Sequence, residues 1–196
     1  MGENLRSINK LELNDAYRKV LQWFFSFPNM PISLSELSKE LKVSKKTASE
    51  IVLALISEGF LIKEEIGRSW RISCDIRHIY NHTRKISYNL HLVYSLIYER
   101  GLIEEIYKIA GQPKSIILFG SYRKGDDNEK SDLDIAVEIV GDEDVNIINI
   151  AEIPEFGYRK KVPVNLHIFT RNKVDLNLFN NIANGIILEG FLEVRT

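Results

Sequence analysis

The stretch that decides the fold lies at residues 115–139 and reads SIILFGSYRKGDDNEKSDLDIAVEI. It opens with a short apolar run that ends at Gly120, which is typical of a buried strand. A segment rich in charge and glycine follows, and residues 131–137 then alternate between polar and apolar as a second strand. The stretch therefore predicts two buried strands whose connection lies at the end of a sheet.

Two aspartates occupy alternate positions of the second strand. Because side chains on a strand alternate, Asp132 and Asp134 share one face, and Leu133 points into the core. Two carboxylates about 7 Å apart along a strand can converge on a pair of divalent ions. Without a cation the two negative charges repel each other, and Mg²⁺ prefers one or two protein carboxylates together with phosphate and water oxygens. The pair predicts a Mg²⁺ site; the competing interpretation is a solvated strand end.

The turn between the strands supplies groups that suit a triphosphate. Gly120 lets the backbone come close to a phosphate chain, while the Ser121 hydroxyl and free N–H groups of the turn can donate hydrogen bonds to its oxygens. Lys124 adds a positive charge on the same side. Together with the aspartates, these residues predict a magnesium–nucleotide site that stabilises negative charge on a transferring phosphate.

Gly-Ser, ten intervening residues and Asp-x-Asp form a motif that resembles the nucleotidyltransferase fold of the DNA polymerase β superfamily, in its small minimal form, over residues 102–196. The resemblance implies that Asp132 and Asp134 are catalytic and bind Mg²⁺. It also implies that Gly120 and Ser121 bind the phosphates of ATP or another nucleoside triphosphate. Lys124 stands where members often have arginine, so the single charge of an ammonium group replaces a guanidinium that could bind phosphate through two hydrogen bonds.

One position departs from the pattern of the family. Active members usually carry a third carboxylate on a later strand, and Asn165 stands there, within residues 162–169. An asparagine amide can coordinate a metal ion but cannot accept a proton. His167 shares a face with Asn165, so it is an alternative base; it is otherwise an ordinary strand-edge histidine.

The remaining segments of this half predict helices and a last strand. Residues 102–110 and the start of residues 174–188 have helical spacing, and a terminal strand follows Gly185. Residues 75–100 keep the same spacing up to Gly101, which predicts one long connecting helix of roughly 35 to 40 Å. This helix is also a candidate for a dimer contact.

Three potential zinc ligands lie at the start of that helix. Cys74, His78 and His82 follow one another at intervals of four residues. The first and last would lie about 12 Å apart along the helix axis, whereas bonds to zinc are about 2 Å long. We therefore reject a shared metal site and expect an ordinary helix face.

The N-terminal half has the pattern of three helices followed by a hairpin. Apolar spacing predicts helices near residues 14–27, 33–41 and 44–59, and two short strands follow around Gly67. The second helix opens with the Ser-x-x-Glu form of a capping box. This order resembles a winged helix-turn-helix domain of bacterial and archaeal repressors, over about residues 11–74.

In such domains the third helix enters the major groove of DNA and the wing contacts the backbone. The resemblance implies DNA contacts from residues near the start of that helix and from the wing: Ser44, Lys45, Lys46, Thr47, Ser49 and Arg68. Winged helices also serve as dimerisation or protein-docking modules, so that alternative stays open. Because strong binders contact about six to ten phosphates, we expect a homodimer rather than a monomer to be the DNA-binding unit.

The whole chain has the composition of a globular protein, with 196 residues, 44% hydrophobic and 27% charged. It lacks a run of roughly 18 apolar residues and an apolar core near residue 1, so we expect a cytoplasmic protein without a membrane span. The net charge of −1 combines two unlike parts. Residues 1–85 carry 14 Lys and Arg against 10 Asp and Glu, and residues 86–196 carry 12 against 17.

The sequence thus predicts an α+β protein with three parts: a winged helix-turn-helix domain at 1–74, a connecting helix at 75–101, and a nucleotidyltransferase domain with a mixed sheet and flanking helices at 102–196. We expect transfer of a nucleoside monophosphate, AMP from ATP first, to a hydroxyl of a macromolecule. Minimal family members that modify a helical toxin of the HEPN type suggest such a protein as a partner. The alternatives are a transcriptional regulator with an idle nucleotide-sensing domain and, more weakly, an antibiotic-modifying transferase.

Overall fold

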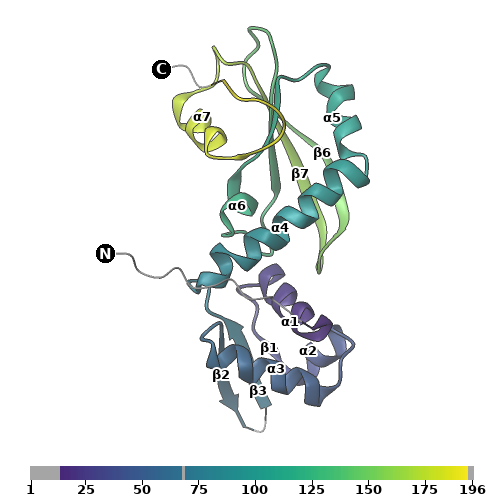
Figure 1. The fold of residues 1–196 in the computed structure, drawn as a ribbon, viewed down its shortest axis with the longest axis vertical. Helices are drawn as coiled ribbons and strands as arrows, with labels where there is room; N and C mark the ends of the chain where they lie inside the picture. Colours follow the sequence, from purple (N-terminus) through teal and green to yellow (C-terminus); the bar gives the residue numbers. More distant parts are fainter. Residues whose placement is uncertain (1–13, 68, 194–196) are drawn as a thin grey trace, which may run out of the picture.

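The structure is a computed structural model, which describes residues 14–67 and 69–193. Figure 1 shows a smaller N-terminal half and a larger C-terminal half, with α4 (Arg84–Tyr94) between them. Helices and a mixed sheet make up the larger half, so the α+β class is as predicted. In the part of the chain that the structure describes, no helix is long and apolar enough to cross a membrane.

The N-terminal half contains the three helices and the hairpin that the sequence predicts. Their bounds are as follows: α1 Asp15–Ser26, α2 Leu34–Glu40, α3 Lys45–Ser57, β2 Leu61–Ile66 and β3 Ser69–Cys74. A short strand that we did not predict, β1 (Ile32–Ser33), pairs with β3, which gives the antiparallel order β1-β3-β2. That this half is a winged helix-turn-helix domain stays a prediction.

Polar side chains fix where these helices begin. Asn14 accepts a hydrogen bond from the Tyr17 N–H at the start of α1, and Ser33 and Glu36 form the predicted capping box of α2. Ser44 accepts from the Thr47 N–H and caps α3. Behind the caps lies an apolar core, whose fully buried members include Val20, Phe24, Leu37, Val52, Leu55, Phe60 and Ile72.

The single long helix expected over residues 75–100 is not formed. The structure has a 3₁₀ turn, η1 (Ile79–His82), then α4, and then a π-helical turn, η2 (Ser95–Glu99). The cause is local: the buried Asn81 amide donates to the carbonyls of Asp75 and His78, and the His78 ring accepts from the Tyr80 N–H. Such side-chain bonds satisfy the backbone in a non-helical form, so the α-helix begins only at Arg84.

A five-stranded mixed sheet forms the C-terminal half. The strands are β4 Ser115–Leu118, β5 Leu133–Glu138, β6 Asn146–Phe156, β7 Arg159–Phe169 and β8 Ile186–Gly190, in the order β6-β7-β5-β4-β8. Among the strands of the described residues, β5 and β7 alone pair in parallel. All of these except β6 lie where the sequence predicts strands.

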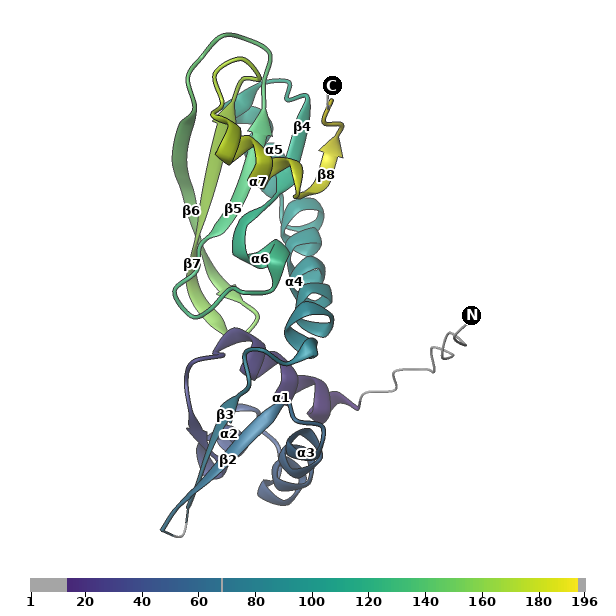
Figure 2. The ribbon, with the colours of Figure 1, turned by 90° about the vertical axis from the view of Figure 1, so that its left-hand side faces the viewer.

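Helices cover both faces of this sheet (Figure 2). On one face α4, η2 and α5 (Leu102–Ala110) pack on Leu133, Ile135 and Val137. On the other face α7 (Leu176–Ala183) packs on Ile117, Ala136 and Phe169, and the short helix α6 (Gly120–Lys124) follows β4. The predicted alternation along β5 is confirmed, because its odd-numbered residues enter the first core and Ala136 the second.

Candidate active site

The site lies where β5 begins. Asp132 comes directly before this strand and Asp134 is its second residue. Asn165 lies on the parallel neighbour β7, in register with Asp134. Its amide Nδ2 donates to Asp132 Oδ2 at 3.0 Å. The structure therefore brings both aspartates and Asn165 together, as the sequence predicts.

A second asparagine, from the strand that the sequence analysis missed, fixes the orientation of the first. Asn149 on β6 pairs with Asn165 in register, and its Nδ2 donates to Asn165 Oδ1 at 3.0 Å. Asn165 thus uses its oxygen towards Asn149 and its N–H groups towards Asp132. The three isoleucines at 147, 148 and 150 are β-branched residues that favour a strand, and they are the signal that could have revealed β6.

His167 is attached to the second aspartate. Its Nε2 lies 3.1 Å from Asp134 Oδ1, and the His167 side chain is 13% exposed. The ring packs edge-on against Phe119, with 4.8 Å between the ring centres. Its Nδ1 is buried and has no hydrogen-bond partner among the described residues. His167 is therefore a partly buried neighbour of Asp134 and not an ordinary exposed strand-edge histidine.

The glycine of the Gly-Ser turn lies against Asp134. Gly120 has a φ of +73°, and a Cβ built there would lie 2.7 Å from Asp134 Oδ2. Only glycine combines this left-handed backbone with so close an approach. Ser121 follows within α6, at the same end of the helix. Lys124 is exposed at the other end, about 6 Å away along the helix axis.

The donor set suits Mg²⁺ bound together with a phosphate ligand. Mg²⁺ takes one or two protein carboxylates and completes its shell with substrate phosphate oxygens and water, and Asp132 and Asp134 provide two carboxylates beside the Gly120 turn. No group of three His, Cys, Asp or Glu side chains suited to a metal ion occurs within residues 14–67 and 69–193. A metal ion here would therefore need oxygens from a substrate or from water.

Residues 99–188 match the family model of the nucleotidyltransferase domain. The matched range contains the Gly-Ser turn, both aspartates and the Asn165 strand. It supports placing this half of the chain in the nucleotidyltransferase superfamily, as the motif implies. No curated protein and no solved structure matches the chain.

The residues predicted to contact DNA lie around the start of α3. Ser44, Lys45 and Lys46 are exposed, and Thr47 and Ser49 are half-buried. The hydroxyls of Ser44 and Thr47 lie 2.7 Å apart in the cap itself. Arg68 lies outside the described residues.

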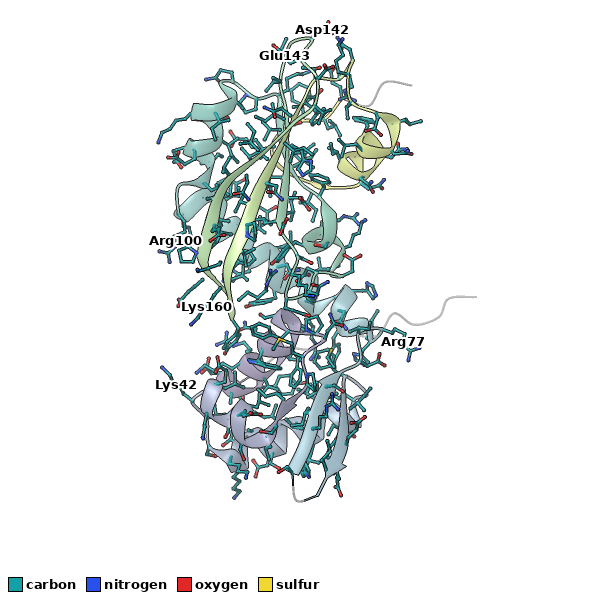
Figure 3. All side chains as sticks on the ribbon, turned by 180° about the vertical axis from the view of Figure 1, so that it is seen from behind. Lys42, Arg77, Arg100, Asp142, Glu143 and Lys160 are labelled. Atoms are coloured by element: carbon teal, nitrogen blue, oxygen red, sulfur yellow. The ribbon has the colours of Figure 1, made fainter. Side chains whose placement is uncertain are left out.

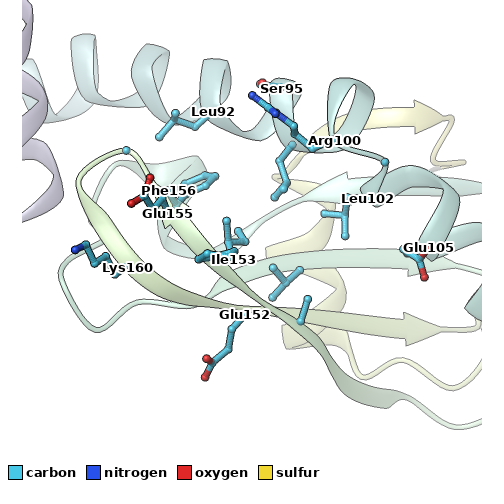
Figure 4. A pocket seen from close by; sticks show the side chains of 16 residues that line it. Leu92, Ser95, Arg100, Leu102, Glu105, Glu152, Ile153, Glu155, Phe156 and Lys160 are labelled. Carbon is cyan, nitrogen blue, oxygen red and sulfur yellow. The ribbon is translucent and has the colours of Figure 1, made fainter.

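A groove of about 810 Å³ lies away from the nucleotidyltransferase motif, between η2, the start of α5 and β6 (Figure 4). Leu92, Leu102, Ile153 and Phe156 line it, and these residues pack with the core on the sheet face opposite Ala136. None of the predicted site residues lines this groove. The candidate active site and the groove are therefore on opposite faces of the sheet.

Proposed function

We propose that the chain is a Mg²⁺-dependent nucleotidyltransferase that transfers a nucleoside monophosphate, AMP from ATP first, to a hydroxyl of a macromolecular acceptor. The observation that carries this proposal is the approach of the Gly120 backbone to Asp134, beside Asp132. The Gly120 turn can bind a phosphate chain, and the two carboxylates can hold the Mg²⁺ that accompanies it. Both lie at the same corner of the sheet. The family match over residues 99–188 supports the class of reaction.

In this mechanism the residues of the chain bind and orient. Asp132 and Asp134 would hold Mg²⁺, which supplies positive charge to phosphate oxygens as negative charge develops on them. The Gly120 backbone and the Ser121 hydroxyl bind the phosphate chain and align the α-phosphorus with the acceptor hydroxyl. The acceptor oxygen forms a bond to this phosphorus, the bond to pyrophosphate breaks, and the hydroxyl proton is released.

Position 165 provides no carboxylate base to accept the proton of the acceptor hydroxyl. Asn165 donates to Asp132 and accepts from Asn149, and an amide cannot take a proton. His167 is the nearest alternative base in sequence, but its Nε2 contacts Asp134. We therefore expect slow transfer compared with a site that has a third carboxylate.

Calorimetric titration with Mg-ATP tests the site. We expect binding by the native chain and loss of binding in the variant Asp132→Ala/Asp134→Ala. The matched control, Asp142→Ala/Asp144→Ala, removes the same charge from two exposed positions of the same half and should bind like the native chain. Equal binding by the native chain and the Asp132→Ala/Asp134→Ala variant would contradict the proposal.

One observation favours a second function, a DNA-binding regulator whose C-terminal half only senses nucleotide: Asn165 stands in the position of the acid. Transfer of label from α-labelled ATP to lysate proteins separates the two functions. A labelled product that depends on Asp132 and Asp134 supports the enzyme, and a helical protein of the HEPN type among the products would identify the expected partner. No labelled product, together with DNA binding that changes with ATP, supports the regulator.

For the N-terminal half we propose DNA contact through the start of α3, where two exposed lysines adjoin the helix N-terminus. The variant Lys45→Gln/Lys46→Gln should weaken DNA binding and lower the slope of log affinity against log salt by about two. The control is Lys160→Gln/Lys161→Gln at the β6–β7 hairpin, where Figure 3 shows Lys160 projecting from the other half of the molecule. Equal loss in both variants would indicate a non-specific charge effect; no loss in either would favour a docking or dimerisation module.

A further inference from the structure

The connection between the Gly-Ser turn and Asp132 is held by a buried ion pair. Lys85 Nζ, from the first turn of α4, donates to the backbone carbonyl of Asp127 and lies 3.3 Å from its Oδ1. The side chains of Lys85 and Asp127 are 1% and 3% exposed. Asn89, one helical turn further on, donates to Asp127 Oδ1 at 2.7 Å and to the Tyr122 carbonyl at 3.1 Å.

Burial opposes the charges of this pair. Desolvation lowers the pKa of Lys85 and raises the pKa of Asp127, and their mutual attraction only partly offsets both shifts. Two apolar side chains of similar volume often stabilise a core as well as a buried ion pair does. What an apolar pair cannot supply is a directed hydrogen bond to the backbone of Asp127. The distinctive effect of Lys85 is therefore on the position of this connection.

The position of Asp127 is transmitted to Asp132 by a tight turn. The Asn128 N–H donates to Ser131 Oγ at 3.0 Å, and the Ser131 N–H donates to the Asn128 carbonyl at 3.1 Å. Asp127 precedes this turn directly and Asp132 follows it directly. A shift of Asp127 therefore moves the residue that presents the first carboxylate.

A second buried cation holds the far end of the same connection. Arg159, at the start of β7 and 5% exposed, donates to the Ser131 carbonyl at 2.7 Å and to the Glu129 carbonyl at 3.2 Å. It also donates to the Tyr122 hydroxyl on α6. Residues 127–131 are thus fixed at both ends, by Lys85 from α4 and by Arg159 from the sheet.

We propose that Lys85 is a positioning residue, which through Asp127 sets the carboxylate of Asp132 for the magnesium–nucleotide complex. This inference rests on the proposed function. It assigns to α4, which precedes the range of the family match, a part in the geometry of the site.

The test compares Lys85→Met with Lys85→Met/Asp127→Leu. The single variant leaves Asp127 buried without its ion-pair partner, so the Tm should fall. The double variant removes both charges and should recover most of the Tm, but its Kd for Mg-ATP should stay at least tenfold weaker than that of the native chain. Full recovery of both Tm and Kd would show that the pair is only structural and would overturn the proposal.

Two further variants keep the result decisive. Glu138→Gln removes a buried charge that pairs with the half-buried Arg171 at the other end of β5, so it should lower the Tm without changing the Kd. Lys85→Arg keeps the charge but changes the geometry of the bond, so it serves if the double variant does not fold. It should weaken Mg-ATP binding several-fold, and an unchanged Kd in this variant would also overturn the proposal.

Mg-ATP binding by the native chain distinguishes the proposed function from the positioning role of Lys85. Absence of Mg-ATP binding by the native chain would contradict the function. In that case the positioning role is decided by hydrogen exchange in peptides that span residues 126–134. Exchange there should be faster in the Lys85→Met/Asp127→Leu or the Lys85→Arg variant than in the native chain. Unchanged exchange would overturn the inference.

Discussion

At the scale of single residues, an amide stands beside Asp132 and Asp134 where a third acid would add negative charge. The Asn165 N–H group donates to Asp132, which partly offsets the repulsion between the carboxylates in the absence of a cation. A carboxylate at the same position would be a better metal ligand and a proton acceptor, but it would increase this repulsion. With asparagine at position 165 the site gains a hydrogen bond to Asp132 but has no basic carboxylate there.

The variant Asn165→Asp tests this balance. Without Mg²⁺ its Tm should lie a few degrees below that of the native chain, because a third carboxylate joins the pair. With Mg²⁺ its Tm should rise by more than that of the native chain, because binding to the folded state stabilises it. Thermal unfolding with and without Mg²⁺ measures both effects. Asn149→Asp adds the same charge one strand further away, and an equal response of the two variants would contradict the prediction.

At the scale of elements, the turn over residues 75–83 replaces the start of the expected long helix. Asn81 is 3% exposed, and its amide donates to the carbonyls of Asp75 and His78. The same two carbonyls also accept from the backbone N–H groups of His78 and Asn81, so the side chain adds a second hydrogen bond to each. Asn81 therefore stabilises the turn that precedes α4.

Removal of this side chain should destabilise the chain. Asn81→Ala removes two hydrogen bonds made by a buried side chain. Because each such bond contributes about 0.5 to 1.5 kcal/mol, we expect a loss of about 1 to 3 kcal/mol in the free energy of unfolding. Urea denaturation measures this loss. His82→Ala changes the exposed neighbour in the same 3₁₀ turn and should cost less than about 0.5 kcal/mol. Similar values for the two variants would show that the Asn81 contacts do not stabilise the turn.

At the scale of the whole molecule, the turn over residues 75–83 and α1 both contact Glu58 at the end of α3. Glu58 Oε2 accepts from the hydroxyls of Tyr17 and Tyr80, at 2.9 and 2.7 Å. The Arg84 guanidinium lies 3.7 Å from the centre of the Tyr80 ring. Cys74, the last residue of the hairpin, is buried at 8% exposure at the edge of this region.

Burial raises the pKa of the Cys74 thiol to about 12, which predicts a chemical and a thermodynamic effect. The folded chain should react slowly with a thiol reagent at pH 8, and a denaturant should restore the rate. Because the folded pKa is raised above the ordinary value of 9.0, this group favours the folded state below pH 9. That contribution is lost as the pH rises towards 12.

The urea midpoint of the native chain should therefore fall more steeply above pH 9 than that of Cys74→Ala, which has no thiol to titrate. Equal slopes for the two proteins, or rapid labelling of the folded chain at pH 8, would contradict the prediction.

Local sequence patterns predict some features of this fold and not others. Strong local signals predicted elements correctly: the apolar run at 115–118 predicted β4, and the capping box at Ser33 predicted the start of α2. The alternation after Ser131 predicted the strand that carries Asp134. Helical periodicity alone misassigned residues 75–83, because it does not register the hydrogen bonds of Asn81. Asn149 was missed because β6 was not predicted. Lys85 could not be placed, since its contact with Asp127 joins elements that lie 42 residues apart in the chain.

The contacts of α4 determine where the C-terminal half can be separated from the rest of the chain. The family match begins at residue 99, yet Lys85 and Asn89 hold Asp127 from an earlier helix. A fragment that starts at residue 99 would leave that carboxylate without its partners, so an exchange of N-terminal halves must keep α4. The turn over residues 75–83 also packs closely against Gly125: a Cβ at Gly125 would lie 2.1 Å from the Asn81 carbonyl oxygen. Any rotation of the N-terminal half about the turn over residues 75–83 must therefore break or move a contact with the connection between Gly120 and Asp132.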